Sequence, residues 1–159
     1  METQGQKTAA PAPVLAIDLG EKRVGVAISD ALSISITRLA ALRRTNWKQL
    51  LRSVDEIVRR FDAKTVVIGF PLQLNGFRGD AAENVRSIAL KFARSLSIPV
   101  YLQDERLTSV EAAENLRAAG HRPDTVPDLI DSEAAAVILR DFLVSSEPKI
   151  PVSPSEQTP

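Results

Sequence analysis

The chain has 159 residues, in which 20 Lys and Arg residues balance 20 Asp and Glu residues, with one histidine and no cysteine. That length suits a single domain, because two domains would leave about 80 residues for each core. The absence of cysteine excludes a disulfide scaffold, a thiolate metal site and a cysteine nucleophile. A single histidine excludes a multi-histidine zinc site and leaves only His121 as the base of any Ser-His-Asp triad.

The neutral net charge conceals an asymmetry between the two parts of the chain. Residues 1–94 hold 15 Lys and Arg against 9 Asp and Glu, whereas residues 95–159 hold 5 against 11. Such an asymmetry indicates either nucleic-acid or metal binding, or a chance division of solvated surface charge.

Composition also divides the chain into three parts. Residues 1–13 are predicted to be a flexible lead, 14–144 a single folded domain, and the Pro-rich residues 145–159 a disordered tail. The start lacks the apolar stretch of a signal peptide, and no apolar run approaches the roughly 20 residues that span a bilayer. These features predict a cytoplasmic protein with no membrane partner.

Three strands are predicted first, over residues 14–20, 24–29 and 33–38, close enough to form an antiparallel meander. Helices are then predicted over 47–61, about 85–96, 108–120 and 131–144, with strands over 65–70 and 98–103. Strands that alternate with helices favour parallel pairing through right-handed crossovers. The order therefore predicts an α/β fold with a mixed five-stranded sheet and helices on both faces.

Asp18 interrupts an otherwise apolar strand whose neighbours are all expected to be buried. A lone carboxylate there costs several kcal/mol unless it is paired or binds a cation. The ordinary alternatives are a salt bridge to Lys22 or Arg23, or a turn-capping role before Gly20.

Two other acidic segments are also placed where a ligand site could form. The tripeptide Asp104-Glu105-Arg106 directly follows a predicted parallel strand, where open α/β sheets place their ligand sites, although an ordinary polar loop would look the same. Asp131 shares a helical stripe with Ala134, Ala135, Ile138 and Phe142, although it could instead be a helix N-cap or first-turn acid. Carboxylates without histidine or cysteine partners favour Mg²⁺ or Mn²⁺, the ions used in two-metal phosphodiester hydrolysis.

Basic and amide side chains near these acids could contact a phosphate backbone. Lys22 and Arg23 lie one turn from Asp18, and the loop over 71–80 contains Asn75 and Arg78, although that loop could also be a plain surface loop. Residues 38–60 hold seven Lys and Arg against two acids, which fits either a solvated helix face or a surface that follows a nucleic-acid backbone.

Four sequence blocks, in order, resemble the YqgF family of small RuvC-related proteins, described as Holliday-junction resolvases or pre-16S rRNA nucleases. The blocks are Asp18-Leu-Gly-Glu-Lys-Arg-Val-Gly-Val-Ala27, Val67-Ile-Gly-Phe-Pro71 with Gly76, Asp104-Glu-Arg-Leu-Thr108 and Asp131-Ser-Glu-Ala-Ala135. Departures are small: Phe70 replaces the usual Leu, and Ser109 replaces a frequent Thr.

The resemblance implies a ribonuclease H-like fold and a metal-dependent nuclease. It implies that Asp18, Glu105 and Asp131 are the catalytic and metal-binding acids, with Asp104 competing with Glu105 for its role. Lys22, Arg23, Asn75, Arg78 and Arg106 are then expected to hold the substrate.

The resemblance implies that the function is hydrolysis of structured nucleic acid, at the 5′ end of pre-16S rRNA, with the ribosome as a further partner. The alternatives are a Holliday-junction DNA resolvase, a non-catalytic nucleic-acid-binding module and an actin-like ATP-binding domain. A monomer would suit RNA processing, whereas a homodimer would suit the two symmetric cuts of a junction.

Overall fold

A computed structural model describes residues 10–70, 80–104, 118, 120, 126–145 and 148–154, with only the backbone course given for 80–81 and 126–131. Along the chain the elements are β1 (Val14–Leu19), β2 (Arg23–Ser29), β3 (Ile36–Arg43), α1 (Trp47–Phe61), β4 (Thr65–Phe70), α2 (Asp80–Ser95), β5 (Val100–Asp104), α4 (Val126–Val144) and β6 (Ile150–Pro151). No helix in the described ranges is long and apolar enough to cross a membrane.

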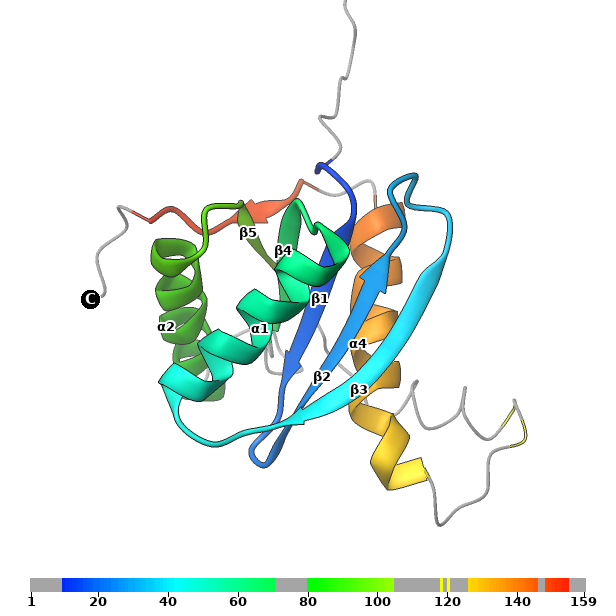
Figure 1. Cartoon of the computed structure of the whole chain (residues 1–159), viewed down its shortest axis with the longest axis horizontal. Coiled ribbons are helices and arrows are strands. Elements are labelled where there is room, and N and C mark those ends of the chain that lie inside the picture. Colours follow the sequence, from blue (N-terminus) through cyan, green and yellow to red (C-terminus); the bar gives the residue numbers. More distant parts are fainter. Residues whose placement is uncertain are drawn as a thin grey trace, which may run out of the picture.

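The strands form one sheet in the order β3-β2-β1-β4-β5-β6. The meander β1–β2–β3 is antiparallel, and β1, β4 and β5 pair in parallel. The helices cover both faces of the sheet, with α1 and α2 on one face and α4 on the other (Figure 1). The predicted mixed sheet with helices on both faces is therefore confirmed.

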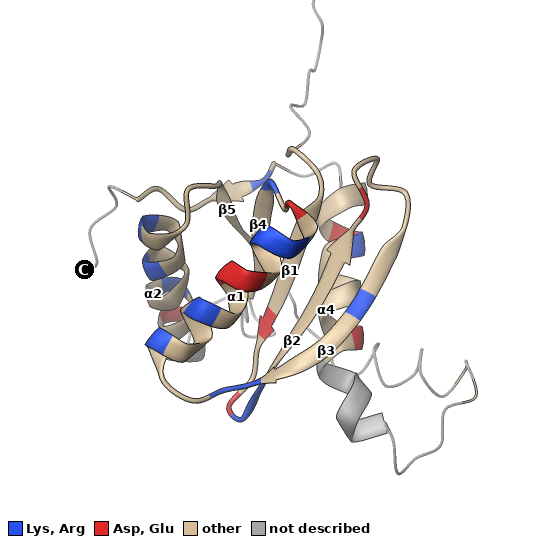
Figure 2. Cartoon of the chain, viewed as in Figure 1, with Lys and Arg blue, Asp and Glu red and all other residues tan. Residues whose placement is uncertain are grey.

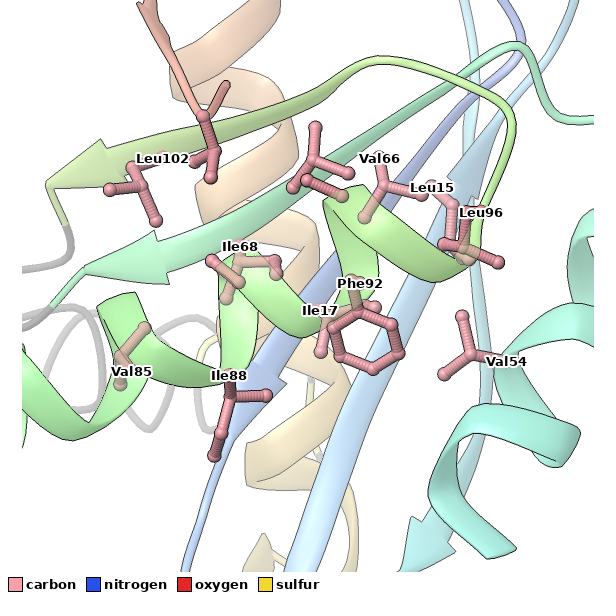
Figure 3. Packing of buried hydrophobic residues seen from close by; sticks show 14 of the residues in the cluster. Leu15, Ile17, Val54, Val66, Ile68, Val85, Ile88, Phe92, Leu96 and Leu102 are labelled. Carbon is pink, nitrogen blue, oxygen red and sulfur yellow. The ribbon is translucent and has the colours of Figure 1, made fainter. Parts of the chain in front are cut away.

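Alternation along the strands divides the apolar side chains between two cores. In β1, Leu15 and Ile17 pack in the larger core against α1 and α2, whereas Val14 and Ala16 pack against α4. Figure 3 shows the larger core, in which Phe92 of α2 lies over strand residues such as Ile17. This assignment of faces determines where each polar side chain of the sheet points.

The predicted number of five strands is wrong, because the described residues already form six strands of one sheet. The sixth, β6, lies in the Pro-rich segment for which disorder was predicted, and it pairs antiparallel with β5. Val152, which follows β6, is only 4% exposed and belongs to the larger core. One buried apolar side chain and a short backbone pairing are enough to hold residues 150–152 against the sheet.

The third strand begins later than residues 33–38 predict and runs from Ile36 to Arg43. The cause is Asp30, whose Oδ1 accepts hydrogen bonds from the backbone N–H groups of Ile34 (2.6 Å) and Ser35 (3.0 Å). These bonds hold residues 30–35 as a turn, in which Ser33 has a φ of 57°. The hydrogen bond from Ser35 lowers the pKa of the Asp30 carboxyl below its ordinary value.

Helix α1 is capped at both ends, by Asn46 and by Asp62. The Asn46 side chain accepts a hydrogen bond from the Gln49 N–H at 2.9 Å, and Asp62 ends the helix in the left-handed conformation with a φ of 54°. Leu50 and Val54 are the buried residues of its inward face. The predicted helix over 47–61 is thus reproduced, with caps that satisfy its terminal amide and carbonyl groups.

Helix α4 begins at Val126, five residues before the predicted start at Asp131. Pro127 stands in its first turn, where the missing N–H costs nothing. Most of the predicted helix over 108–120 lies outside the described residues, although Gly120 has a φ of 88°, as a helix-ending glycine would.

Candidate functional site

One edge of the sheet gathers the segments that carry the predicted site. The carboxyl ends of β1, β4 and β5 lie there because the three strands are parallel, and the β1–β2 hairpin and the end of β3 adjoin them (Figure 1). The carboxyl end of the parallel strands is the edge at which open α/β sheets bind ligands.

Asp18 lies near the carboxyl end of β1 and faces α4. Its neighbours Ile17 and Leu19 pack in the larger core, and the residue two before it, Ala16, packs under α4. Alternation therefore places the Asp18 side chain on the α4 side, where it is partly buried. A partly buried carboxylate at this edge fits the prediction of a polar site.

Glycine residues flank Asp18 on both neighbouring strands. Gly25 of β2 is its direct partner, and Gly69 of β4 follows Ile68, the partner of Ile17. Neither glycine carries a side chain and both are buried, so the sheet surface beside the carboxylate is low and a helix can approach it closely.

Small residues on α4 fit this low surface. Ala135 and Ala136 pack against β1 and β2 residues such as Ala16 and Ala27. Asp131 occupies the helix position one turn before Ala135, on the stripe that continues to Ile138. The backbone thus places the Asp131 position on the sheet-facing stripe, and its side chain lies outside the described atoms.

The two residues after Asp131 anchor α4 to β3. The Ser132 hydroxyl donates to the carbonyl oxygen of Leu39 at 2.6 Å. The Glu133 carboxylate, with a side chain 9% exposed, accepts from the Arg38 guanidinium at 2.7 Å. These contacts hold the helix segment that carries Asp131 in a defined position on the sheet.

The helix boundary bears on the alternative role of Asp131 as an N-cap. Because α4 begins at Val126, Asp131 lies in its second turn, where it is neither an N-cap nor a first-turn acid. The capping explanation of this acid is therefore wrong.

Asp104 lies on the other side of the sheet from Asp18. It pairs with Phe70, and both positions belong to the face of the larger core, because Ile68 and Leu102 do. The strand β4 also separates the two acids, a lateral distance of about 10 Å. Asp18 and Asp104 therefore do not form a pair on one face.

The basic residues of the β1–β2 hairpin adjoin Asp18. Lys22 and Arg23 are exposed at its tip, and the colours of Figure 2 show positive charge there and at the end of β3. Arg44 holds this hairpin: its guanidinium donates to the carbonyl oxygen of Gly20 at 2.8 Å, and its N–H donates to that of Lys22 at 2.9 Å. The sequence did not single out Arg44, because only the pairing of β2 with β3 brings it to Gly20.

Several predicted site residues are not tested by this geometry. Glu105, Arg106, Asn75 and Arg78 lie outside the described residues. The side chains that the structure describes contain no group of three acids or histidines placed to hold a metal ion, and this search covers neither Glu105 nor the Asp131 side chain. The three-acid set remains a prediction.

The fold is ribonuclease H-like and is similar to that of RuvC-type resolvases. Thermus thermophilus RuvC in complex with a Holliday junction substrate aligns with a TM-score of 0.54 and 18% identity, over 87% of this chain and 98% of RuvC. The fowlpox virus resolvase, in complex with Holliday junction DNA, aligns with a TM-score of 0.51 and 16% identity, over 84% and 98%. At sequence identities this low, the structural similarity to these two proteins shows a shared fold.

The chain belongs to the RuvX family, whose model carries the description Holliday junction resolvase and matches residues 12–145. A relative from Syntrophus aciditrophicus, named "Putative pre-16S rRNA nuclease", is 37% identical over 87% of this chain and 93% of its own. One of the same name from Chloroflexus aurantiacus is 39% identical over 82% and 85%. The resemblance to YqgF proteins is thereby confirmed, and the chain is a member of a nuclease family.

Proposed function

We propose that the chain is a metal-dependent endonuclease that processes the 5′ end of pre-16S rRNA, with its reaction centre at Asp18. The observation that carries the proposal is the position of this acid: partly buried, at the carboxyl end of the central parallel strand, facing α4 across a surface lowered by Gly25. The RNA substrate is supported by the names of the curated relatives.

The donor chemistry of this edge fits a hard divalent ion. We propose that Asp18, Glu105 and Asp131 hold Mg²⁺ or Mn²⁺, since carboxylate oxygens are the ligands these ions prefer. The bound ion would supply an activated water and stabilise charge on the phosphate. Glu105 is preferred to Asp104 because Asp104 falls on the face opposite Asp18.

The remaining predicted residues bind and orient the substrate. Lys22 and Arg23 offer cationic donors beside Asp18, and Arg44 keeps their hairpin in place through the Gly20 carbonyl. Asn75, Arg78 and Arg106 complete the proposed phosphate contacts. The proposed compartment is the cytoplasm, where ribosomal precursors are matured.

The test compares Asp18→Asn with wild type on a labelled RNA that carries the 5′ end of pre-16S rRNA and on a labelled DNA four-way junction. With Mg²⁺ or Mn²⁺, cleavage by Asp18→Asn should fall at least about 100-fold, because a ligand that stabilises transition-state charge is worth several kcal/mol. Mn²⁺ should also raise the melting temperature of wild type and leave that of Asp18→Asn unchanged.

Asp62→Asn is the matched control. Asp62 is an exposed α1 cap that leads to the opposite end of β4, and asparagine tolerates its left-handed conformation. Its cleavage should equal that of wild type. Wild-type rates in Asp18→Asn would refute the site, and wild-type cleavage of the junction but not of the RNA would identify a DNA resolvase.

A further inference from the structure

The ends of β2 and β3 and the β1–β2 hairpin line a basic hollow of about 600 Å³ beside the proposed reaction centre. Its lining holds four cations and one acid, together with two apolar residues: Lys22, Arg23, Arg43, Arg44, Glu21, Ala41 and Leu42. Figure 2 shows this positive charge at the sheet edge toward which the acid-bearing strand β1 runs.

The two arginines at the strand ends are direct partners. Arg23 of β2 pairs with Arg43 of β3, and both are exposed. A phosphate that contacts both guanidinium groups would be held by two cations from neighbouring strands.

These arginines share the side of the sheet on which Asp18 lies. Gly25, the partner of Asp18, is two residues from Arg23, so alternation places Gly25, Arg23 and Arg43 on the same face. A strand of nucleic acid whose phosphate lies at Asp18 can therefore continue over Arg23 and Arg43 without crossing the sheet.

Beyond Arg43 the surface turns around the end of β3 onto the opposite face of the sheet, which α1 and α2 cover. A second hollow shares Leu42 and Arg43 with the first and adds polar side chains of Asn46, Gln49 and Ser53. A third shares Arg44 with the first and Asn46 with the second, and reaches Lys91 of α2. Cations and uncharged hydrogen-bonding groups in series are typical of a surface that follows a sugar–phosphate backbone.

We propose that this tract, from Lys22 and Arg23 through Arg43 and Arg44 to Lys91, binds the phosphodiester backbone of the substrate at phosphates other than the one cleaved. The proposal extends the proposed nuclease function by assigning binding roles to Arg43 and Lys91. Phosphodiester is common to RNA and DNA, so the test uses both.

The test measures binding by fluorescence anisotropy in EDTA, with the labelled RNA and the labelled four-way junction, over a series of salt concentrations. Arg43→Gln should weaken binding about 5-fold at moderate salt and should reduce the slope of log affinity against log salt by about 1. Arg43→Lys should keep the wild-type slope, because it keeps the charge. In cleavage assays, Arg43→Gln should raise KM and leave kcat near that of wild type.

Arg60→Gln is the matched control, because it removes one exposed positive charge from the last turn of α1 and should leave affinity and salt slope unchanged. Equal affinities and slopes for Arg43→Gln and Arg60→Gln on both probes would overturn the proposal. An effect on one probe only would identify that nucleic acid as the ligand of the tract. Because binding is measured without metal, failure of the Asp18 assignment would leave this result standing.

Discussion

Asp30 shows how one carboxylate can determine where a strand begins. Its two hydrogen bonds to backbone N–H groups delay β3 until Ile36, although the alternation of polar and apolar residues over 33–38 predicts an earlier strand. Period-two alternation reports a preference for extended backbone, and a local side-chain turn can override it.

The lowered pKa of Asp30 predicts a pH-dependent contribution to stability. Because its pKa is lower in the folded chain than the ordinary value of 3.8, the ionised carboxylate stabilises the fold above that pH, and the contribution is lost as the pH falls toward the folded-state pKa. Asp30→Asn should therefore be less stable than wild type at pH 7, with the difference vanishing in acid. Urea unfolding at several pH values would check this, and a constant difference would contradict it.

At the proposed site, the sequence draws attention to a polar residue that interrupts an apolar pattern. Asp18 stands out in an apolar strand, and its orientation toward α4 follows from alternation with Ala16 and Ile17. Arg44 could not be found in this way. Its bond to Gly20 spans 24 residues and depends on the register of β3 against β2.

Among the elements, β6 carries the clearest difference from the prediction. Four prolines in residues 145–159 predict disorder, yet Ile150 and Pro151 pair with Leu102 and Tyr101 of β5. Composition describes what a segment can do alone, whereas this pairing depends on an edge strand that has folded elsewhere in the chain.

The burial of Val152 predicts that the segment containing β6 contributes to the stability of the fold. Val152→Ala should lower the free energy of unfolding by about 2 kcal/mol, since two buried methyl groups are lost and a cavity remains. The control is Val144→Ala, the same substitution at a side chain that is 73% exposed, for which almost no change is expected. Equal effects in chemical denaturation would show that the segment after residue 149 contributes nothing to the core.

Over the whole molecule, the Arg38–Glu133 ion pair joins parts of the chain 95 residues apart. Glu133 is nearly buried and Arg38 is 45% exposed. Removing Arg38 should therefore lower the free energy of unfolding by a different amount from removing the charge of Glu133. Arg38→Ala leaves a buried carboxylate without its cation and should cost about 2–3 kcal/mol, whereas Glu133→Gln keeps an acceptor and leaves an arginine that water can reach, at about 1 kcal/mol.

Arg59→Ala serves as the control for this comparison. Its pair with Asp55 is an exposed i,i+4 contact, with the arginine side chain 80% exposed, and its loss should cost less than about 0.5 kcal/mol. Urea unfolding of the three variants at neutral pH measures the order. A cost for Arg38→Ala no greater than that for Arg59→Ala would show that the link between β3 and α4 is dispensable for stability.

The uneven charge along the sequence has a spatial counterpart. The basic part of the chain supplies Lys22, Arg23, Arg43 and Arg44 around one hollow, next to Asp18. The sequence indicated this division between basic and acidic parts. It could not indicate that residues 21–23 and 41–44 meet, because that depends on the pairing of β2 with β3.

The short strand β6 also restricts how copies of this chain could associate. Without it, β5 would offer an open row of backbone groups to which another strand could add. With it, the edge ends in two residues, of which Pro151 has no N–H to donate. Self-association by extension of the sheet is therefore disfavoured at this edge.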